Sequence, residues 1–163
     1  MKDDKYKPMA ILLTYTLDIL MTFGGIALIF ILYKTFSSIT EGNRLKYIFN
    51  SLIFFTGTSL LLAILYELRA ILKSVIKAGP FTMKNVKALN LIAVFSFMIT
   101  ICYLINYFYN NQFKSFQIIS IDATGIHTDT EFLIFFFAGS LILILAKVYK
   151  IAVEVKEEND FTI

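Results

Sequence analysis

An acidic side chain interrupts the first long apolar run of this sequence. Asp18 lies within residues 9–33, and Thr14 and Thr22 lie four residues to either side of it, on the same face of a helix. A charge inside a membrane span costs about 2.5–3.5 kcal/mol on insertion scales, so Asp18 should face other helices rather than lipid. There it could hold a proton or a cation, or contact a ligand. The other interpretation is structural: the carboxyl group hydrogen-bonds to Thr14, Thr22 or Asn106 and fixes the packing of two helices.

Basic side chains gather in the middle of the chain. Three of them follow one another at i, i+4 and i+8 along one helix face, and two more come after the next turn. Each positive charge near an anionic leaflet contributes about 1 kcal/mol of attraction, so these residues can simply anchor the topology. Alternatively they form a docking face for a cytoplasmic partner. Because membrane topology already accounts for the charge, we expect no direct binding of nucleic acid. The five residues are Arg69, Lys73, Lys77, Lys84 and Lys87.

A turn motif separates the two halves of the chain. Gly79 can adopt the left-handed conformation that ends a helix, and Pro80 cannot continue one. Thr82 is a suitable N-cap for the next helix. The sequence therefore predicts that one helix ends and another begins here. The motif comprises Gly79, Pro80, Phe81 and Thr82, and its last two residues recur as Phe161 and Thr162 at an offset of 80.

Short signatures of catalysis and metal binding are absent from the sequence. It contains no nucleophile elbow, Walker loop, HExxH or CxxC motif. His127 is the single histidine, and one imidazole near scattered carboxylates is a weak metal signal. With Cys102 as the single cysteine, an intrachain disulfide is impossible. We therefore expect no enzymatic activity, no cofactor and no metal ion.

Four apolar runs supply the elements that position these residues. Of the 163 residues, 58% are hydrophobic and 17% are charged, and the mean hydropathy is +0.73; soluble domains are less apolar and more charged. Each run can cross about 30 Å of hydrocarbon as a helix, so the predicted fold class is an all-α integral membrane protein built as a four-helix bundle. The second and fourth helices should continue past the membrane surface, to residues 79 and 158. The runs are residues 9–33, 47–67, 86–109 and 131–148.

The chain divides into two copies of a helical hairpin. At an ungapped offset of 80, Lys34-Thr35-Phe36 aligns with Lys114-Ser115-Phe116, and Val75 aligns with Val155. We interpret residues 1–163 as one membrane domain, with repeat one at about 9–80 and repeat two at about 89–160. Lysine and arginine number 11 in the two terminal segments and the middle connection, against 4 in the two other loops. The positive-inside rule then places both termini in the cytoplasm and makes the hairpins parallel repeats.

Two smaller patterns concern the second loop and the contacts between helices. Ile119, Ile121 and Ala123 alternate with polar residues ahead of Gly125, which is typical of a short strand. Glycines within the spans allow helices to approach closely, so we expect them at helix contacts. They are Gly24, Gly25, Gly57 and Gly139.

The middle turn and the C-terminal tail together resemble a known family. The stretches that carry the resemblance are Leu68-Arg69-x-Ile71, Gly79-Pro80-Phe81-Thr82, Asn85-Val86 and Glu157-Glu158-x-Asp160-Phe161-Thr162-Ile163. They are similar to small bacterial four-span membrane proteins classed as domain of unknown function 2975, and the likeness covers nearly the whole chain. Members are often encoded beside a small helix-turn-helix regulator. The resemblance therefore implies a plasma-membrane protein that holds or antagonises a DNA-binding repressor, and it implies no active site.

Two classes of function remain open at this point, both with the lipid bilayer as a partner. In the first, a non-enzymatic regulatory protein binds a cytoplasmic helix-turn-helix regulator or senses the state of the membrane. In the second, Asp18 and its polar neighbours serve a small transporter, or an immunity protein against membrane-active compounds. Four spans leave little room for a pathway, so a transporter would require a homo-oligomer.

Overall fold

The described residues form four long helices and one short hairpin. The computed structural model describes residues 7–37, 44–110, 118, 120–122, 125–127 and 129–160. The recurring dipeptide Phe161-Thr162 and the segment Lys114-Ser115-Phe116 lie outside the described residues. The helices are α1 (Lys7–Ser37), α2 (Arg44–Ala78), α3 (Met83–Tyr109) and α4 (Glu131–Asp160), and the strands of the hairpin are β1 (Ser120–Asp122) and β2 (Gly125–His127).

All four helices are long and apolar enough to cross a membrane. This confirms the predicted class, a multi-pass membrane protein with four helical spans. Helix α2 has 35 residues and is therefore about 52 Å long, against about 30 Å of hydrocarbon. It runs without a break to Ala78, and α4 runs to Asp160. Both helices therefore continue beyond the length that a bilayer core requires, as the sequence predicted.

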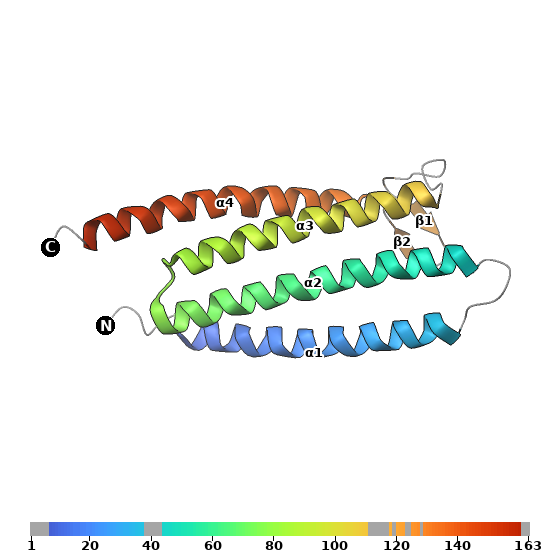
Figure 1. The fold of residues 1–163 in the computed structure, drawn as a ribbon, viewed down its shortest axis with the longest axis horizontal. Coiled ribbons are helices and arrows are strands. Elements are labelled where there is room, and N and C mark those ends of the chain that lie inside the picture. Colours follow the sequence, from blue (N-terminus) through green and yellow to red (C-terminus); the bar gives the residue numbers. More distant parts are fainter. Residues whose placement is uncertain are drawn as a thin grey trace.

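The helices form an open row rather than the closed four-helix bundle that we expected. Within the described residues, contacts between helices join α1 to α2, α2 to α3 and α3 to α4 only. Figure 1 shows them in chain order, each antiparallel to the next, with both termini at one end. Lipid tails are as apolar as side chains, so closing a bundle in lipid gains little from the hydrophobic effect. Residues from Ile31 on α1 to Phe135 on α4 line one cavity, which indicates that the row is curved.

The described part of the alternating pattern in the second loop, Ser120–Asp122, forms a strand. Ile119 and Ala123 lie outside the described residues. Ser120 pairs with His127 and Ile121 with Ile126 in an antiparallel register. Gly125 begins the second strand, so the predicted strand is one half of a two-stranded hairpin.

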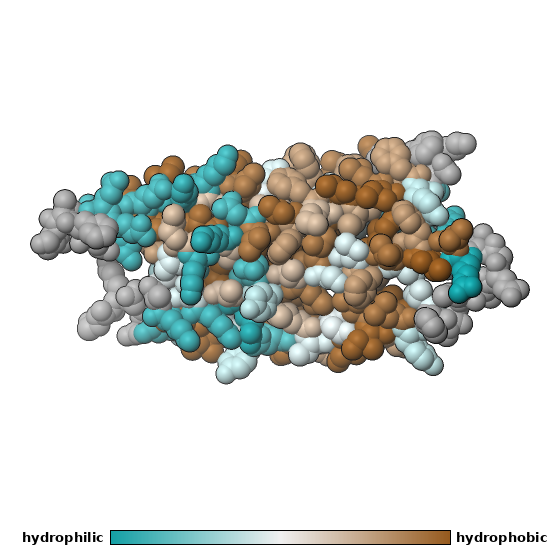
Figure 2. Space-filling view, in the orientation of Figure 1, coloured by the Kyte–Doolittle hydropathy of each residue, from teal (hydrophilic) through white to brown (hydrophobic). Residues whose placement is uncertain are grey.

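Polar and apolar residues segregate along the length of the helices. Figure 2 shows hydrophilic residues gathered over the part of the molecule near the two termini, and apolar residues over much of the remainder. We call the first part the termini end; it holds the start of α1, the turn at 79–82 and the last turns of α4. The opposite part, which holds the β1–β2 hairpin, is the loop end.

Buried side chains are few and concentrate on α3. Ile92 and Ala93 are almost completely buried. The buried hydroxyl groups bond within the helix: Ser96 Oγ donates to the Ile92 carbonyl at 2.9 Å, and Thr100 Oγ1 to the Ser96 carbonyl at 3.1 Å. Thr100 Oγ1 also lies 3.4 Å from the Phe132 carbonyl oxygen on α4. The tightest seam of the row is therefore the one between α3 and α4.

Two of the four glycines expected at helix contacts lie at them. A Cβ atom at Gly139 would stand 3.1 Å from Ser96 Cβ, and one at Gly24 would stand 2.7 Å from Leu62 Cδ2. Cβ atoms at Gly25 and Gly57 would meet nothing within 4 Å. Close approach therefore explains one glycine in each hairpin, α1–α2 and α3–α4.

The ungapped offset of 80 residues can be compared with the positions of the helix ends. Shifted by 80 residues, the end of α2 at Ala78 falls within two residues of the end of α4 at Asp160. By contrast, Lys34-Thr35 belongs to α1, whereas residue 114 follows the end of α3 at Tyr109. The connection between α3 and α4 is longer than that between α1 and α2, which shifts α3 relative to α1.

Candidate functional site

Asp18 on α1 forms an ion pair with Arg69 on α2. Arg69 Nη2 donates to Asp18 Oδ2 at 3.0 Å, and Arg69 Nε lies against Asp18 Oδ1. The Asp18 side chain is 35% exposed and the Arg69 side chain is 29% exposed. The planar guanidinium group suits a carboxylate in this orientation. The pair therefore ties the first two helices together through opposite charges.

This partner differs from the three that the sequence suggested for Asp18. Thr14 Oγ1 donates to the Ala10 carbonyl and Thr22 Oγ1 to the Ile19 carbonyl, each at 2.7 Å. Both threonines thus bond to their own helix, as hydroxyl side chains in helices often do. Asn106 bonds with Asn110 near the loop end instead.

The sequence did not point to Arg69 as the partner of Asp18, because Arg69 is the first member of an i, i+4, i+8 series of basic residues. Lys73 and Lys77 are exposed, whereas Arg69 is partly covered. Arg69 also lies one helical turn, about 6 Å, closer to the apolar part of α2 than Lys73 does. A charge at that depth needs a counter-charge far more than one at the surface. That requirement, together with a lone carboxylate on α1, was the available signal.

The remaining basic residues of the middle stretch are exposed on the surface of the row. The side chains of Lys73, Lys77, Lys84 and Lys87 are all exposed. Lys150 on α4 pairs with Glu154 one turn later, with Nζ to Oε1 at 3.4 Å. The termini end therefore presents a mixed but lysine-rich surface.

The carbonyl oxygen of Pro80 organises the turn between α2 and α3. It accepts from the Thr82 amide at 3.1 Å, from Asn85 Nδ2 at 2.6 Å, and from the Tyr149 hydroxyl. Asn85 is only 2% exposed, so its hydrogen bond to Pro80 is buried. We call the hydrogen bonds that Asn85 and Tyr149 donate to the Pro80 carbonyl oxygen the clamp at the turn. Tyr149 belongs to α4 and lies 69 residues from Pro80, so its role could not be predicted from the sequence.

The ends of the two helices at this turn follow the sequence prediction. Gly79 has φ = +86°, in the left-handed region that glycine tolerates best. Thr82 is the N-cap of α3, and its side chain accepts from the Asn85 amide at 3.4 Å. Phe81 stacks on Tyr149 with ring centroids 5.3 Å apart. The turn is therefore held against α4 by both a hydrogen bond and a ring contact.

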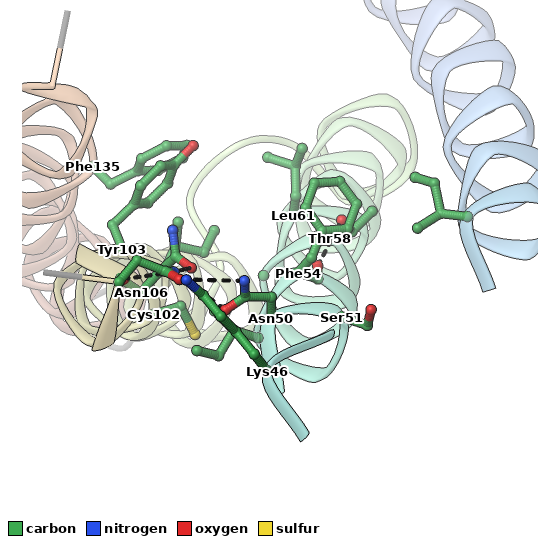
Figure 3. Close-up of a pocket in the computed structure, with 15 residues that line it drawn as sticks. Lys46, Asn50, Ser51, Phe54, Thr58, Leu61, Cys102, Tyr103, Asn106 and Phe135 are labelled. Carbon is green, nitrogen blue, oxygen red and sulfur yellow. Dashed lines mark hydrogen bonds between the residues drawn. The ribbon is translucent and has the colours of Figure 1, made fainter. Parts of the chain in front are cut away.

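Three asparagines form a second polar cluster, at the loop end. Asn50 and Asn110 exchange amide hydrogen bonds, with Nδ2 to Oδ1 distances of 3.4 and 3.2 Å. Asn110 Nδ2 also donates to Asn106 Oδ1 at 2.9 Å. Figure 3 shows Lys46 and Asn50 of α2 across from Asn106 of α3. Of this cluster the sequence singled out Asn106 alone.

We also looked for side chains that could bind a metal ion together. Among the described residues, no group of three or more His, Cys, Asp or Glu side chains is placed to hold a metal ion. The side chain of His127 lies outside what is described. The polar sites to be explained are therefore the ion pair, the clamp at the turn and the asparagine cluster.

Four apolar helices in an antiparallel row, with charges gathered at one end, define a small multi-pass membrane protein. The chain belongs to the family described as "Protein of unknown function (DUF2975)", whose model matches residues 4–163. No curated protein and no solved structure matches the chain.

Proposed function

We propose that this chain is a non-enzymatic regulatory protein of the bacterial plasma membrane whose termini end faces the cytoplasm and binds a helix-turn-helix regulator. The orientation follows from the lysines and arginines, which lie mostly in the segments at that end. The two hairpins then enter the membrane from the same side, as parallel repeats. The bound regulator would be held at the membrane or released from it according to the state of the helical row.

The observation that carries this proposal is an apolar surface at the termini end. Phe81, Ile151 and Val155 are 43%, 61% and 50% exposed. Phe81 lies in the turn between α2 and α3, and Ile151 and Val155 lie where α4 continues past Lys147 and Lys150. Both places belong to the termini end, which Figure 2 shows as mainly hydrophilic. Lipid tails do not cover side chains beyond the lysines that mark the membrane surface, so these residues are available to a protein partner.

A shallow groove gives this surface a shape. Its volume is about 320 Å³, and Phe81 forms one wall while Val155 and Ala152 of α4 form the other. Lys156 and Asn159 complete the lining. An apolar groove with a polar rim is the kind of site that takes one or two apolar side chains of a partner helix. The clamp at Pro80 holds the two walls together, because Tyr149 joins the turn to α4.

The test is recovery of the regulator from membranes. Wild-type protein should co-purify with a DNA-binding protein, and Val155→Asp should reduce its recovery about tenfold because a carboxylate in place of an apolar contact would have to be desolvated when the partner binds. Val155→Ile, which keeps the surface apolar, is the matched control and should recover as much partner as the wild type. Equal recovery with Val155→Asp, or no DNA-binding protein with the wild type, would contradict the proposal.

The ion pair favours a second candidate function, that of a small transporter or an immunity protein against membrane-active compounds. Asp18 and Arg69 are charged groups shared between two spans, and such groups often mark ion or substrate pathways. An open row of four helices would need a homo-oligomer to enclose a path. Asp18→Asn should then abolish transport or protection, and an unchanged phenotype would exclude this candidate.

A further inference from the structure

A cavity of about 940 Å³ opens between α2 and α3 on the concave side of the row. This volume is at the upper end of the range for small-molecule sites. On α2 the lining follows one face, from Lys46 and Asn50 to Thr58 and Leu61. Figure 3 shows Lys46 and Asn50 directed toward Asn106 and Cys102 of α3.

The lining changes from polar to apolar with depth on both helices. Nearest the loop end lie Lys46 and Asn50 of α2, together with Asn106 of α3 and its C-cap residue Asn110. Farther along lie Leu61 of α2 and Ile99 of α3, with Phe135 contributed by α4. A ligand that fits this gradient has a polar head and an apolar chain. A wholly polar ligand would leave the inner part of the cavity unfilled.

The polar end is suited to a negatively charged head. Lys46 is the one charged residue among those that line the cavity, and no ion pair to it is found among the described residues. Asn106 Oδ1 accepts from Asn110, while Asn106 Nδ2 has no acceptor in the described part of the chain. An ammonium group and a free amide donor together favour an anionic oxygen, as in a phosphate group.

We propose that this cavity binds an anionic phospholipid, with its phosphate at Lys46 and Asn106 and one acyl chain between α2 and α3. Phe54 and Leu61 line the cavity and are 52% and 43% exposed, so a lipid can enter sideways from the bilayer. The polar part of this cavity lies at the loop end, whereas the groove at Phe81 lies at the termini end. Lipid binding therefore requires no protein partner and does not rest on the regulatory function proposed above.

The experiment uses the full-length protein in nanodiscs of phosphatidylcholine that contain a minor fraction of chain-spin-labelled phosphatidylglycerol. The fraction of immobilised label measures binding. Lys46→Gln should weaken binding about fivefold, the effect of about 1 kcal/mol for one lysine near a lipid phosphate. Lys34→Gln, at the same end but outside the cavity, is the control and should leave binding unchanged.

A second pair of variants tests the apolar part of the cavity. Gly57 lines it and Gly25 does not, and a Cβ at either would meet nothing within 4 Å. Gly57→Leu should therefore fill the cavity and reduce immobilised label about tenfold, whereas Gly25→Leu should not.

Two results would overturn the lipid site. One is equal immobilisation in wild type, Lys46→Gln and Gly57→Leu. The other is displacement of the labelled lipid by soluble glycerol phosphate, which would mean that the chain contributes nothing and that the site takes free phosphate. Equal binding of spin-labelled phosphatidylcholine would likewise contradict the role assigned to Lys46.

Discussion

Asp18 and Arg69 each depend on the other for a counter-charge. Replacing Arg69 with leucine leaves a carboxylate unpaired beside lipid, and we expect the free energy of unfolding to fall by about 1–3 kcal/mol. The expected loss is smaller than for a fully buried pair because both side chains are about a third exposed. The double variant Asp18→Leu/Arg69→Leu should regain most of the loss, since neither charge remains. Thermal unfolding in detergent compares the two single variants, Asp18→Leu and Arg69→Leu, with the double variant.

The control for these single and double variants is a substitution at Lys73, one turn after Arg69 on α2. Lys73 is exposed, so Lys73→Leu should change stability by less than about 0.5 kcal/mol. If the losses from Asp18→Leu and Arg69→Leu simply add in the double variant, the two groups are not coupled and the pair has no structural role.

At the residue scale the sequence identified anomalies better than partners. Asp18 stood out because a carboxylate in an apolar run has to be explained. Its partner did not, because Arg69 lies 51 residues away and pairing depends on the register of α1 against α2. Tyr149 was missed for the same reason, whereas Gly79 and Thr82 were assigned correctly because caps depend on local backbone geometry.

Among the elements, the seam between α3 and α4 is sensitive to added volume because backbone as well as side-chain atoms lie close to Gly139. A methyl group at Gly139 would lie 3.1 Å from Ser96 Cβ and 3.2 Å from the Ala93 carbonyl oxygen. Gly139→Ala should therefore lower the free energy of unfolding by about 1–3 kcal/mol, the range for overpacking. Gly25→Ala, where the methyl group meets nothing, should be neutral or slightly stabilising. Thermal unfolding of the two variants compares them directly, and equal melting temperatures would refute this contact.

The clamp at the turn should be separable from the helices that it joins. Tyr149→Phe removes the hydroxyl that donates to the Pro80 carbonyl and keeps the ring that stacks on Phe81. We expect a local loss of about 1 kcal/mol, seen as faster amide hydrogen exchange at residues 79–86. Tyr66→Phe on α2, an exposed position, is the control and should leave exchange in that segment unchanged. Unchanged exchange in Tyr149→Phe would show that the hydroxyl does not hold the turn.

The helices themselves were predictable because their cause is local. An apolar run has to bond its backbone internally in lipid, and a helix does so without reference to the rest of the chain. The predicted spans therefore fall within α1 to α4, and the continuations of α2 and α4 follow from the absence of any helix breaker. The association of the helices depends on contacts between distant parts of the chain. The glycines correctly indicated two of these contacts, but they did not predict the open row.

At the scale of the whole molecule, the open row leaves its two outer helices with little protein around them. In the apolar windows of α1, α2 and α4, 0%, 6% and 11% of the residues are buried, against 33% in α3. Protein contacts therefore concentrate on α3, and the other three helices leave most of their apolar surface to lipid. The proposed lipid site lies within the curve of the row, and the groove lies at the termini end. The two sites share no lining residue.

Which side of the membrane holds the termini end decides whether a cytoplasmic regulator can reach the groove at all. In a Cys102→Ala background, single cysteines at the exposed positions Lys84 and Lys156 report the termini end, and one at Ile118 reports the loop end. The lysine distribution predicts that an impermeant maleimide labels position 118 in intact cells, and labels positions 84 and 156 only after lysis. Four antiparallel spans require positions 84 and 156 to behave alike. Labelling of position 84 without 156 would break the four-span topology, and labelling of both in intact cells would place the groove outside and exclude the regulator.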